Sequence, residues 1–260
     1  MPVTAPTLLV AVIAVTVFVA IVRIALWSPS GQSADDRAML TVVAGRDARL
    51  ALLSVLGRVS VWSVATVAAA CLLVAAARRH GRAALGALVV LCGANVTTQA
   101  LKHTVLDRPD FGLGVHNSLP SGHVTVVAAS VGALLLVVPP AVRPAVAGIG
   151  TFATGMTGLS TIVAGWHRPA DVAAALAVVV AWTCVGVLVH GGRRGRARSA
   201  FLTSVSGGVA SLVAIVLVGV RPVDGLAGFV EASLVLGAVA LTSVLAIWAM
   251  AWLGPIDDQP

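Results

Sequence analysis

The chain has 260 residues, of which 58% are hydrophobic and only 10% are charged. An ordinary soluble domain is roughly 45–50% apolar, so this composition excludes a soluble globular protein and leaves no room for a large soluble domain. The 17 Lys and Arg residues outnumber the 10 Asp and Glu residues, but they lie mainly at the ends of apolar runs. That placement is typical of topology determinants meeting anionic lipid headgroups, and we expect no nucleic-acid partner.

Apolar runs long enough to cross a bilayer recur along the whole chain. A span needs about 20 apolar residues, so the chain has room for roughly eight. The first run is expected to be a retained helix, because no clear small-residue cleavage site follows it. The sequence therefore predicts an all-α, polytopic membrane helix bundle. The expected spans cover residues 6–27, 50–77, 83–101, 121–138, 145–166, 170–189, 201–220 and 232–253.

Three other features of the apolar runs and of the segments between them predict local structure. Residues 28–49 form the longest polar connection before the centre of the chain, and their apolar middle indicates an interfacial segment. Arg58 interrupts the second span and is expected near an interface or facing protein. The three cysteines each lie inside an apolar run and are expected to be small core residues.

The distribution of arginines predicts the orientation. With a cytoplasmic N-terminus, most acidic residues fall outside and the strongest basic loops fall inside, as the positive-inside rule requires. We therefore expect both termini in the cytoplasm, a multi-pass protein of the plasma (inner) membrane, and the stretch from Lys102 to Asp171 facing the extracytoplasmic side. The arginines of the inside loops are Arg78, Arg79, Arg82, Arg143, Arg193, Arg194, Arg196 and Arg198.

Nearly all the polar chemistry of the chain lies between Lys102 and Asp171. The third span ends at Lys102, the fourth begins at Ser121-Gly122-His123, and the fifth ends next to His167. Antiparallel packing of neighbouring spans would bring these ends together, and several ionisable residues meeting at one face of a membrane bundle indicate a functional site.

The residue types favour phosphate chemistry. Lys102 and Arg108 supply positive charge, and residues 121–123 place a hydroxyl and free N–H groups at a helix N-terminus, which suits a phosphate. His167 and Asp171 are four residues apart, so the carboxylate can accept the imidazole N–H and set its tautomer. His167 is therefore a candidate nucleophile and His123 a candidate acid.

A metal site is an open alternative at this point. His103, His116, His123 and His167 could in principle gather around an ion. No carboxylate cluster has the spacing of a hard-metal site, and no histidine pair at zinc spacing is joined to a third ligand. We therefore expect no metal and no other cofactor.

The motif Pro120-Ser121-Gly122-His123, together with Ser160, His167 and Asp171, resembles the type 2 phosphatidic acid phosphatase superfamily. That superfamily includes lipid phosphate phosphatases and bacterial polyprenyl-pyrophosphate phosphatases. The resemblance is close over residues 101–172 and extends in architecture over the first six spans. It implies a six-span phosphatase-like core at residues 1–190. Residues 191–260 would add a basic cytoplasmic loop and two further spans, a structural addition or an oligomer surface, with the oligomeric state left open.

The resemblance also implies a reaction. A lipid phosphate or pyrophosphate, of polyprenyl or glycerolipid type, would be hydrolysed without metal through a phosphohistidine. His167 would attack phosphorus, Asp171 would orient it, and His123 would protonate the leaving oxygen. The residues expected to hold the phosphate oxygens are Lys102, Arg108, Ser121, Gly122, position 161 and, as a substitute, Arg168.

Two departures from the family pattern bear on activity. Five residues separate Lys102 from Arg108, where the family's first motif has six. Ser160 is followed by Thr161, where the family has a phosphate-binding arginine. Losing one such contact would cost about 2–4 kcal/mol of transition-state stabilisation, or roughly 30- to 1000-fold in rate. Arg168, Arg46 or Arg49, all predicted on the same face, could replace it.

Two other functions fit the same residues. A noncatalytic protein that binds or moves a phosphorylated lipid would be consistent with Thr161, although binding alone does not need an oriented nucleophile. A phosphotransferase would form the same phosphohistidine and pass the phosphoryl group to an acceptor other than water.

Overall fold

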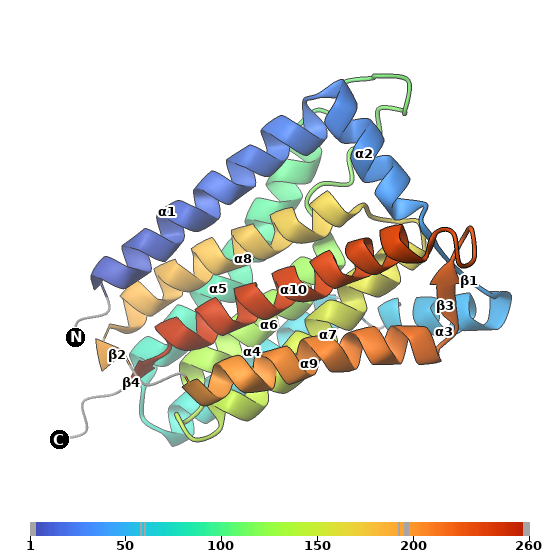
Figure 1. Ribbon diagram of the computed structural model, residues 1–260. Coiled ribbons are helices and arrows are strands. Elements are labelled where there is room, and N and C mark those ends of the chain that lie inside the picture. The colour runs from blue at the N-terminus through green and yellow to red at the C-terminus, as the bar shows by residue number, and fades with distance from the viewer. Residues whose placement is uncertain (1–3, 58, 60, 192, 195–197, 257–260) are drawn as a thin grey trace.

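The computed structural model describes residues 4–57, 59, 61–191, 193–194 and 198–256, which form a bundle of long helices lying side by side (Figure 1). Two of these helices end in a short π-helical turn: α1 (Thr4–Ile21) continues as η1 (Val22–Leu26), and α5 (Gly81–Ala100) continues as η2 (Leu101–Val105). The other long helices are α4 (Val61–Ala77), α6 (Gly122–Val137), α7 (Arg143–Val163), α8 (Pro169–His190), α9 (Arg198–Leu217) and α10 (Phe229–Leu253).

The helices confirm a multi-pass membrane protein. Within the described part of the chain, six helices are long and apolar enough to cross a membrane. Two further apolar helices, Trp62–Ala77 and Gly122–Val137, are shorter. An apolar helix therefore occurs at each of the expected positions, while the count of eight spans stays a prediction.

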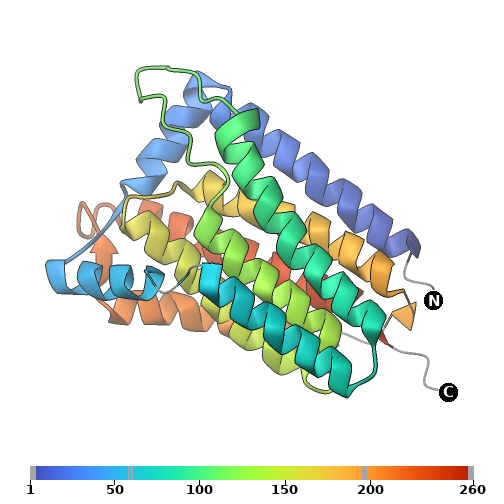
Figure 2. The same ribbon diagram turned by 180° about the vertical axis from the view of Figure 1, so that it is seen from behind.

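The second expected span, residues 50–77, is divided into two helices. Helix α3 (Arg46–Leu56) ends at Gly57, and α4 starts afresh as a separate helix (Figure 2). One helix over residues 50–77 would be about 42 Å long, well above the roughly 30 Å of a bilayer core, so length favours the division. Arg58, expected near an interface, lies outside the described residues.

The polar connection 28–49 contains a helix of its own. Helix α2 (Pro29–Met39) starts with proline in its first turn, and the Ser28 hydroxyl accepts the N–H of Gly31 as an N-terminal cap. After it, β1 (Val42–Ala44) pairs antiparallel with β3 (Val220–Pro222), which holds this segment against the loop between α9 and α10.

A second short ladder joins β2 (Arg193–Arg194) to β4 (Pro255–Ile256) at the other end of the bundle. The sequence predicted neither ladder, because strands of two or three residues leave no alternation to detect.

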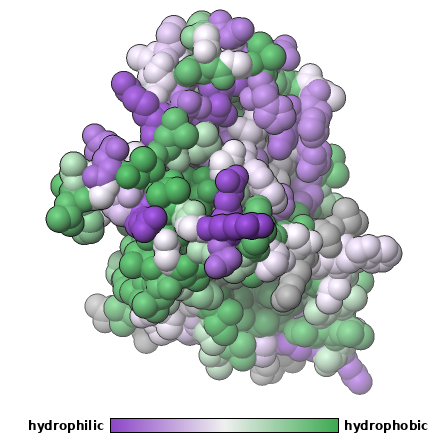
Figure 3. Space-filling view, turned by 90° about the vertical axis from the view of Figure 1, so that its right-hand side faces the viewer, coloured by the Kyte–Doolittle hydropathy of each residue, from purple (hydrophilic) through white to green (hydrophobic). Residues whose placement is uncertain are grey.

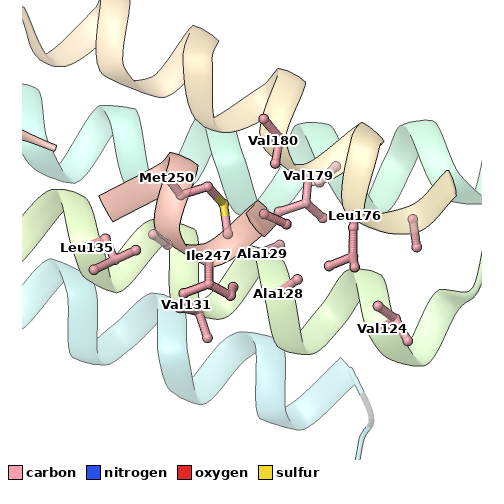
Figure 4. Packing of buried hydrophobic residues seen from close by; sticks show 14 of the residues in the cluster. Val124, Ala128, Ala129, Val131, Leu135, Leu176, Val179, Val180, Ile247 and Met250 are labelled. Carbon is pink, nitrogen blue, oxygen red and sulfur yellow. The ribbon is translucent and has the colours of Figure 1, made fainter. Parts of the chain in front are cut away.

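The core is built around α6, which packs against α5, α7, α8 and α10. Figure 4 shows buried side chains of α6 beside those of α8 and α10. The side chains of α6 are mostly small, and small residues also let other helices approach closely. A Cβ added at Gly186 of α8 would lie 2.8 Å from the carbonyl oxygen of Gly86 on α5, closer than real contacts allow. Cys71 and Cys184 are buried as expected, whereas Cys92 is exposed, because it lies on a face of α5 that no other described helix covers.

The two C-terminal helices pack directly on the rest of the bundle. Ile247 and Met250 of α10 are fully buried beside α6 and α8 (Figure 4), and the Thr183 hydroxyl of α8 donates to Met250 Sδ at 3.0 Å. Helix α9 lies along α7. The division into residues 1–190 and 191–260 stays a prediction, and in this fold α10 is part of the common core.

Polar loops gather at one end of the bundle, here called the site end. It comprises α2, α3, β1, β3 and the connections α5–α6, α7–α8 and α9–α10, and Figure 3 looks onto it, with hydrophilic residues concentrated in the upper half and at the centre. Helix α1 starts, and α10 ends, at the opposite end. The acidic residues of the described chain all lie at the site end: Asp35, Asp36, Asp47, Asp107, Asp110, Asp171, Asp224 and Glu231.

Candidate active site

A buried histidine–carboxylate pair forms the centre of the site end. His167, in the loop between α7 and α8, and Asp171, in the first turn of α8, are 5% and 1% exposed. His167 Nδ1 lies 3.2 Å from Asp171 Oδ2, within reach of a hydrogen bond in which the ring nitrogen donates. This contact leaves Nε2 as the nitrogen with a free lone pair.

Asp171 is held by three donors. Besides the His167 ring, its Oδ2 accepts the Ser118 hydroxyl at 2.6 Å and the backbone N–H of Arg168 at 2.9 Å. Its own carbonyl accepts the backbone N–H of Ser121 at 3.0 Å. The carboxylate is therefore fixed as an acceptor, and the same residue ties the start of α6 to the start of α8.

His123 faces this pair from α6. Its ring centre lies 6.4 Å from that of His167 and 5.4 Å from that of Trp166. Ser121 caps the helix by accepting the N–H of Val124 at 3.5 Å. A Cβ added at Gly122 would meet only the Gln99 side chain, at 3.6 Å, so the first turn of α6 presents its backbone to open space.

Arg108 brings a buried cation to the site. The side chain is 6% exposed, and its Nε and Nη2 atoms have no hydrogen-bond partner among the described residues. Burial lowers the pKa of Arg108, and the nearby Arg168 lowers it further, while Asp171 and Asp35 raise it. An arginine stays protonated at neutral pH even so, and a buried guanidinium with unmet donors is a strong binding group for an oxyanion.

Lys102 lies close enough to His123 to act on its ring electrostatically. It lies in η2 and is half-buried. The Asn117 amide donates to the carbonyls of Lys102 and Leu106 at 3.3 and 2.8 Å, which holds the loop after α5 against the helix end.

Arg168 is engaged within the protein. Its guanidinium pairs with Asp36 Oδ1 at 2.8 Å and donates to the Ser118 hydroxyl at 3.2 Å. The side chain therefore fastens α2 to the start of α8, and its role as a substitute phosphate ligand stays a prediction.

Helix α2 lies over the site and is fastened at several points. Asp35 Oδ1 accepts the backbone N–H of Ala170 at 3.0 Å, and Gln32 donates to the carbonyl of Pro109 at 3.0 Å. Burial raises the pKa of Asp35 to about 7. Sequence reasoning missed Asp35, Asp36 and Ser118 as parts of this site; two adjacent carboxylates in so apolar a chain were the available signal for the first two.

Thr161 contributes through its backbone. The side chain is fully buried, and its hydroxyl donates to the Gly158 carbonyl at 2.8 Å within α7. Its carbonyl accepts the N–H groups of Trp166 and His167 at 3.0 and 3.3 Å, which shapes the loop that carries the histidine. The hydroxyl hydrogen is thus committed to the helix, and phosphate binding by Thr161 stays a prediction.

Among the described residues, no three His, Cys, Asp or Glu side chains are grouped so as to hold a metal ion. His103 and His116 are exposed in the connection between α5 and α6.

An apolar groove lies in the bundle, and its lining includes Val126 and Val127, one turn after His123, and Ser160, near the end of α7. It has a volume of about 720 Å³ and is bounded by α3, α4, α6 and α7. On α6 it is lined by Val127, Ser130 and Leu134, which follow His123 at helical spacing on one face. On α7 the lining runs from Val146 to Ser160, about 21 Å at 1.5 Å per residue, which exceeds the roughly 15 Å of one bilayer leaflet.

Residues 83–195 match the family model described as the PAP2 superfamily. This segment of the chain is similar to that superfamily. The match confirms the resemblance seen in the sequence. It runs from the first turn of α5 to beyond the end of α8, and it includes Lys102, His123, His167 and Asp171. Comparison with curated proteins and with solved structures gave no match. The PAP2 match and the apolar helices together support a phosphatase-type enzyme of the membrane.

Proposed function

We propose that this protein is a metal-independent membrane phosphatase that hydrolyses a lipid phosphate or pyrophosphate through a phosphohistidine. The observation that carries the proposal is the buried His167–Asp171 pair facing His123, together with the guanidinium of Arg108, whose Nε and Nη2 lack hydrogen-bond partners in the described part of the chain. A nucleophile with a set tautomer, an acid and a cation with unmet donors are the parts that phosphoryl transfer requires.

In the first step, His167 Nε2 attacks phosphorus in line with the leaving oxygen. The P–N bond forms, the P–O bond to the leaving group breaks, and His123 gives that oxygen its proton. Asp171 holds the Nδ1 proton and stabilises the positive charge that develops on the ring. Arg108, Lys102, the Ser121 hydroxyl and the Gly122 N–H bind the remaining phosphate oxygens, whose charge rises in the transition state.

In the second step, water attacks the phosphohistidine. The P–N bond breaks, a P–O bond to the water oxygen forms, and His123 takes a proton from the water, which restores its protonated form for the next cycle. The ring centres of His123 and His167 are 6.4 Å apart, a separation that fits a phosphoryl group between an acid–base residue and a nucleophile.

The groove supports a hydrocarbon chain on the substrate. It starts on the His123 face of α6 and is almost entirely apolar, so a phosphate held between the two histidines would have its ester substituent directed into it. A lipid can take up this position from the bilayer without crossing water. Polyprenyl and glycerolipid phosphates share this chemistry, and both are substrate candidates.

The distribution of charge supports an extracytoplasmic site. Basic residues of the described chain lie at both ends of the bundle, but at the opposite end Arg78, Arg79, Arg82 and Arg143 are concentrated in or beside short loops that hold no described acidic residue. Basic residues are retained on the cytoplasmic side of inner-membrane proteins, and this supports our proposal that the reaction takes place on the outer face.

Phosphate release from a lipid phosphate by the purified protein, in detergent and with a metal chelator, tests the proposal. We expect turnover in the wild type and a loss of at least about 10³-fold in His167→Ala, because no other group of the site is positioned to attack phosphorus. Unchanged release in His167→Ala would rule out this nucleophile.

Thr161, which brings no positive charge, favours a noncatalytic lipid-phosphate binder as the second candidate. The two functions differ in one measurable species: acid-labile phosphate trapped on His167 after rapid mixing with labelled lipid phosphate. Trapping followed by transfer to an added alcohol in preference to water would indicate a phosphotransferase.

A further inference from the structure

Arg49 of helix α3 lies next to the end of the apolar groove that is closer to the site. The Arg49 guanidinium donates through Nη2 to the Ala164 carbonyl at 3.1 Å. Ala164 ends α7 and stands three residues before His167 in a tight loop, whose Trp166 and His167 N–H groups turn back to the Thr161 carbonyl. Arg49 is thus fastened to the loop that holds the proposed nucleophile.

Arg49 also lies on the face of α3 that lines the groove. Leu52, Val55 and Leu56 line it from this helix, and Arg49 precedes Leu52 by three residues, so it shares their face one turn closer to the site. A molecule lying in the groove would therefore meet apolar side chains along its length and a guanidinium where it emerges.

On this side of the site, neither α7 nor the start of α8 offers an unpaired positive charge. Arg108 and Lys102 follow α5, on one side of α6, whereas α7 and α3 lie on its other side. On that side Thr161 is neutral and Arg168 is paired with Asp36. The Arg49 side chain is exposed, and the bond to Ala164 engages one of its two terminal nitrogens, which leaves donors for an anion.

We propose that Arg49 is a further substrate-binding residue, whose guanidinium contacts a phosphate oxygen of a substrate with its hydrocarbon chain in the groove. The identity of the substrate rests on the proposed function. The choice of Arg49 rests on the position of α3. Arg49 closes the cationic ring around the phosphate from the side opposite Arg108. Its bond to Ala164 holds it there before the substrate arrives.

Two conservative variants separate charge from anchoring. Arg49→Gln keeps a donor for the Ala164 carbonyl but loses the charge, while Arg49→Lys keeps the charge. A phosphate contact predicts that orthophosphate affinity, measured by calorimetry on the full-length protein in detergent, falls about tenfold or more in Arg49→Gln and Arg49→Ala and less in Arg49→Lys. A purely structural role predicts equal losses in Arg49→Gln and Arg49→Lys, and that result would overturn the proposal.

Arg221→Ala is the matched control for net charge, since Arg221 is an exposed arginine on β3 at the same end of the bundle. The orthophosphate affinity of this variant should stay within about twofold of the wild type.

Hydrolysis of dodecyl phosphate by the same preparations separates the proposed role of Arg49 from the proposed phosphatase function. Turnover and phosphate binding that do not depend on Arg49 would overturn the inference and leave the phosphatase standing. Arg49-dependent phosphate binding without turnover would support the inference and overturn hydrolysis. If the protein neither bound orthophosphate nor hydrolysed dodecyl phosphate, the phosphatase function and the role of Arg49 would both be overturned.

Discussion

Asp35 is the residue whose ionisation bears most directly on the site. Burial raises its pKa from 3.8 to about 7, and its neighbours include Arg108, Arg168 and Asp171. Between about pH 4 and 7 the folded protein therefore holds a proton that the unfolded chain has released. Folding linked to proton uptake loses stability as pH rises through this window.

Asp35→Asn should remove that pH dependence. The amide oxygen can still accept the Ala170 N–H but carries no charge, so we expect the variant to gain thermal stability relative to the wild type as pH rises from 5 to 8. Unfolding midpoints in detergent at pH 5, 6.5 and 8 measure the difference. Asp47→Asn, at an exposed carboxylate of α3, is the control and should change little with pH. A wild type whose stability rises over this range relative to Asp35→Asn would contradict the assignment.

The residues of the site divide into those that spacing reveals and those that only folding brings together. His167 and Asp171 are one helical turn apart, and Ser121, Gly122 and His123 are adjacent, so local patterns were enough to single them out. Ser118 and Asp36 reach the site through contacts across 53 and 132 residues of sequence. Nothing in a local pattern could pair them, because the loop before α6 and the helix α2 meet only in the folded bundle.

At the scale of elements, the groove depends on the division of residues 46–77 into α3 and α4. Composition predicted one long span there, because hydropathy records apolar character and not the direction of the helix axis. The turn after Leu56 separates α3 from α4, and both helices line the groove. Sequence reasoning therefore predicted the apolar character of this region but not the groove itself.

Filling the groove should discriminate between substrates by chain length. Ala153 lines it midway along α7, so Ala153→Phe would occupy the space of a long chain below the phosphate. We expect kcat/KM for dodecyl phosphate to fall about tenfold or more while hydrolysis of a short-chain ester such as butyl phosphate is nearly unchanged. Ala69→Phe, on an exposed face of α4 outside the groove, is the control. Equal loss for both esters would argue against the groove as the chain site.

At the scale of the whole molecule, alternation of the helices puts every element of the site at one end. The loops α5–α6 and α7–α8 lie there together with α2 and α3, so the proposed chemistry has access to a single side of the membrane. The arginine distribution predicted which side, and the fold adds that the acidic residues of the described chain gather around the site. The same helix topology thus determines both where the acidic residues lie and where the site lies.

Single cysteines at the two ends test the orientation in a background without the three natural cysteines. Phe111 is 41% exposed in the α5–α6 connection, and Val142 is 44% exposed between α6 and α7 at the opposite end. With an extracytoplasmic site, a membrane-impermeant maleimide should label Phe111→Cys on intact cells and Val142→Cys only after permeabilisation. The two residues are matched in polarity and exposure, so a difference in labelling reports sidedness. The reverse pattern would put His123 and His167 in contact with the cytoplasm and make the lipid phosphates of the inner leaflet the substrates.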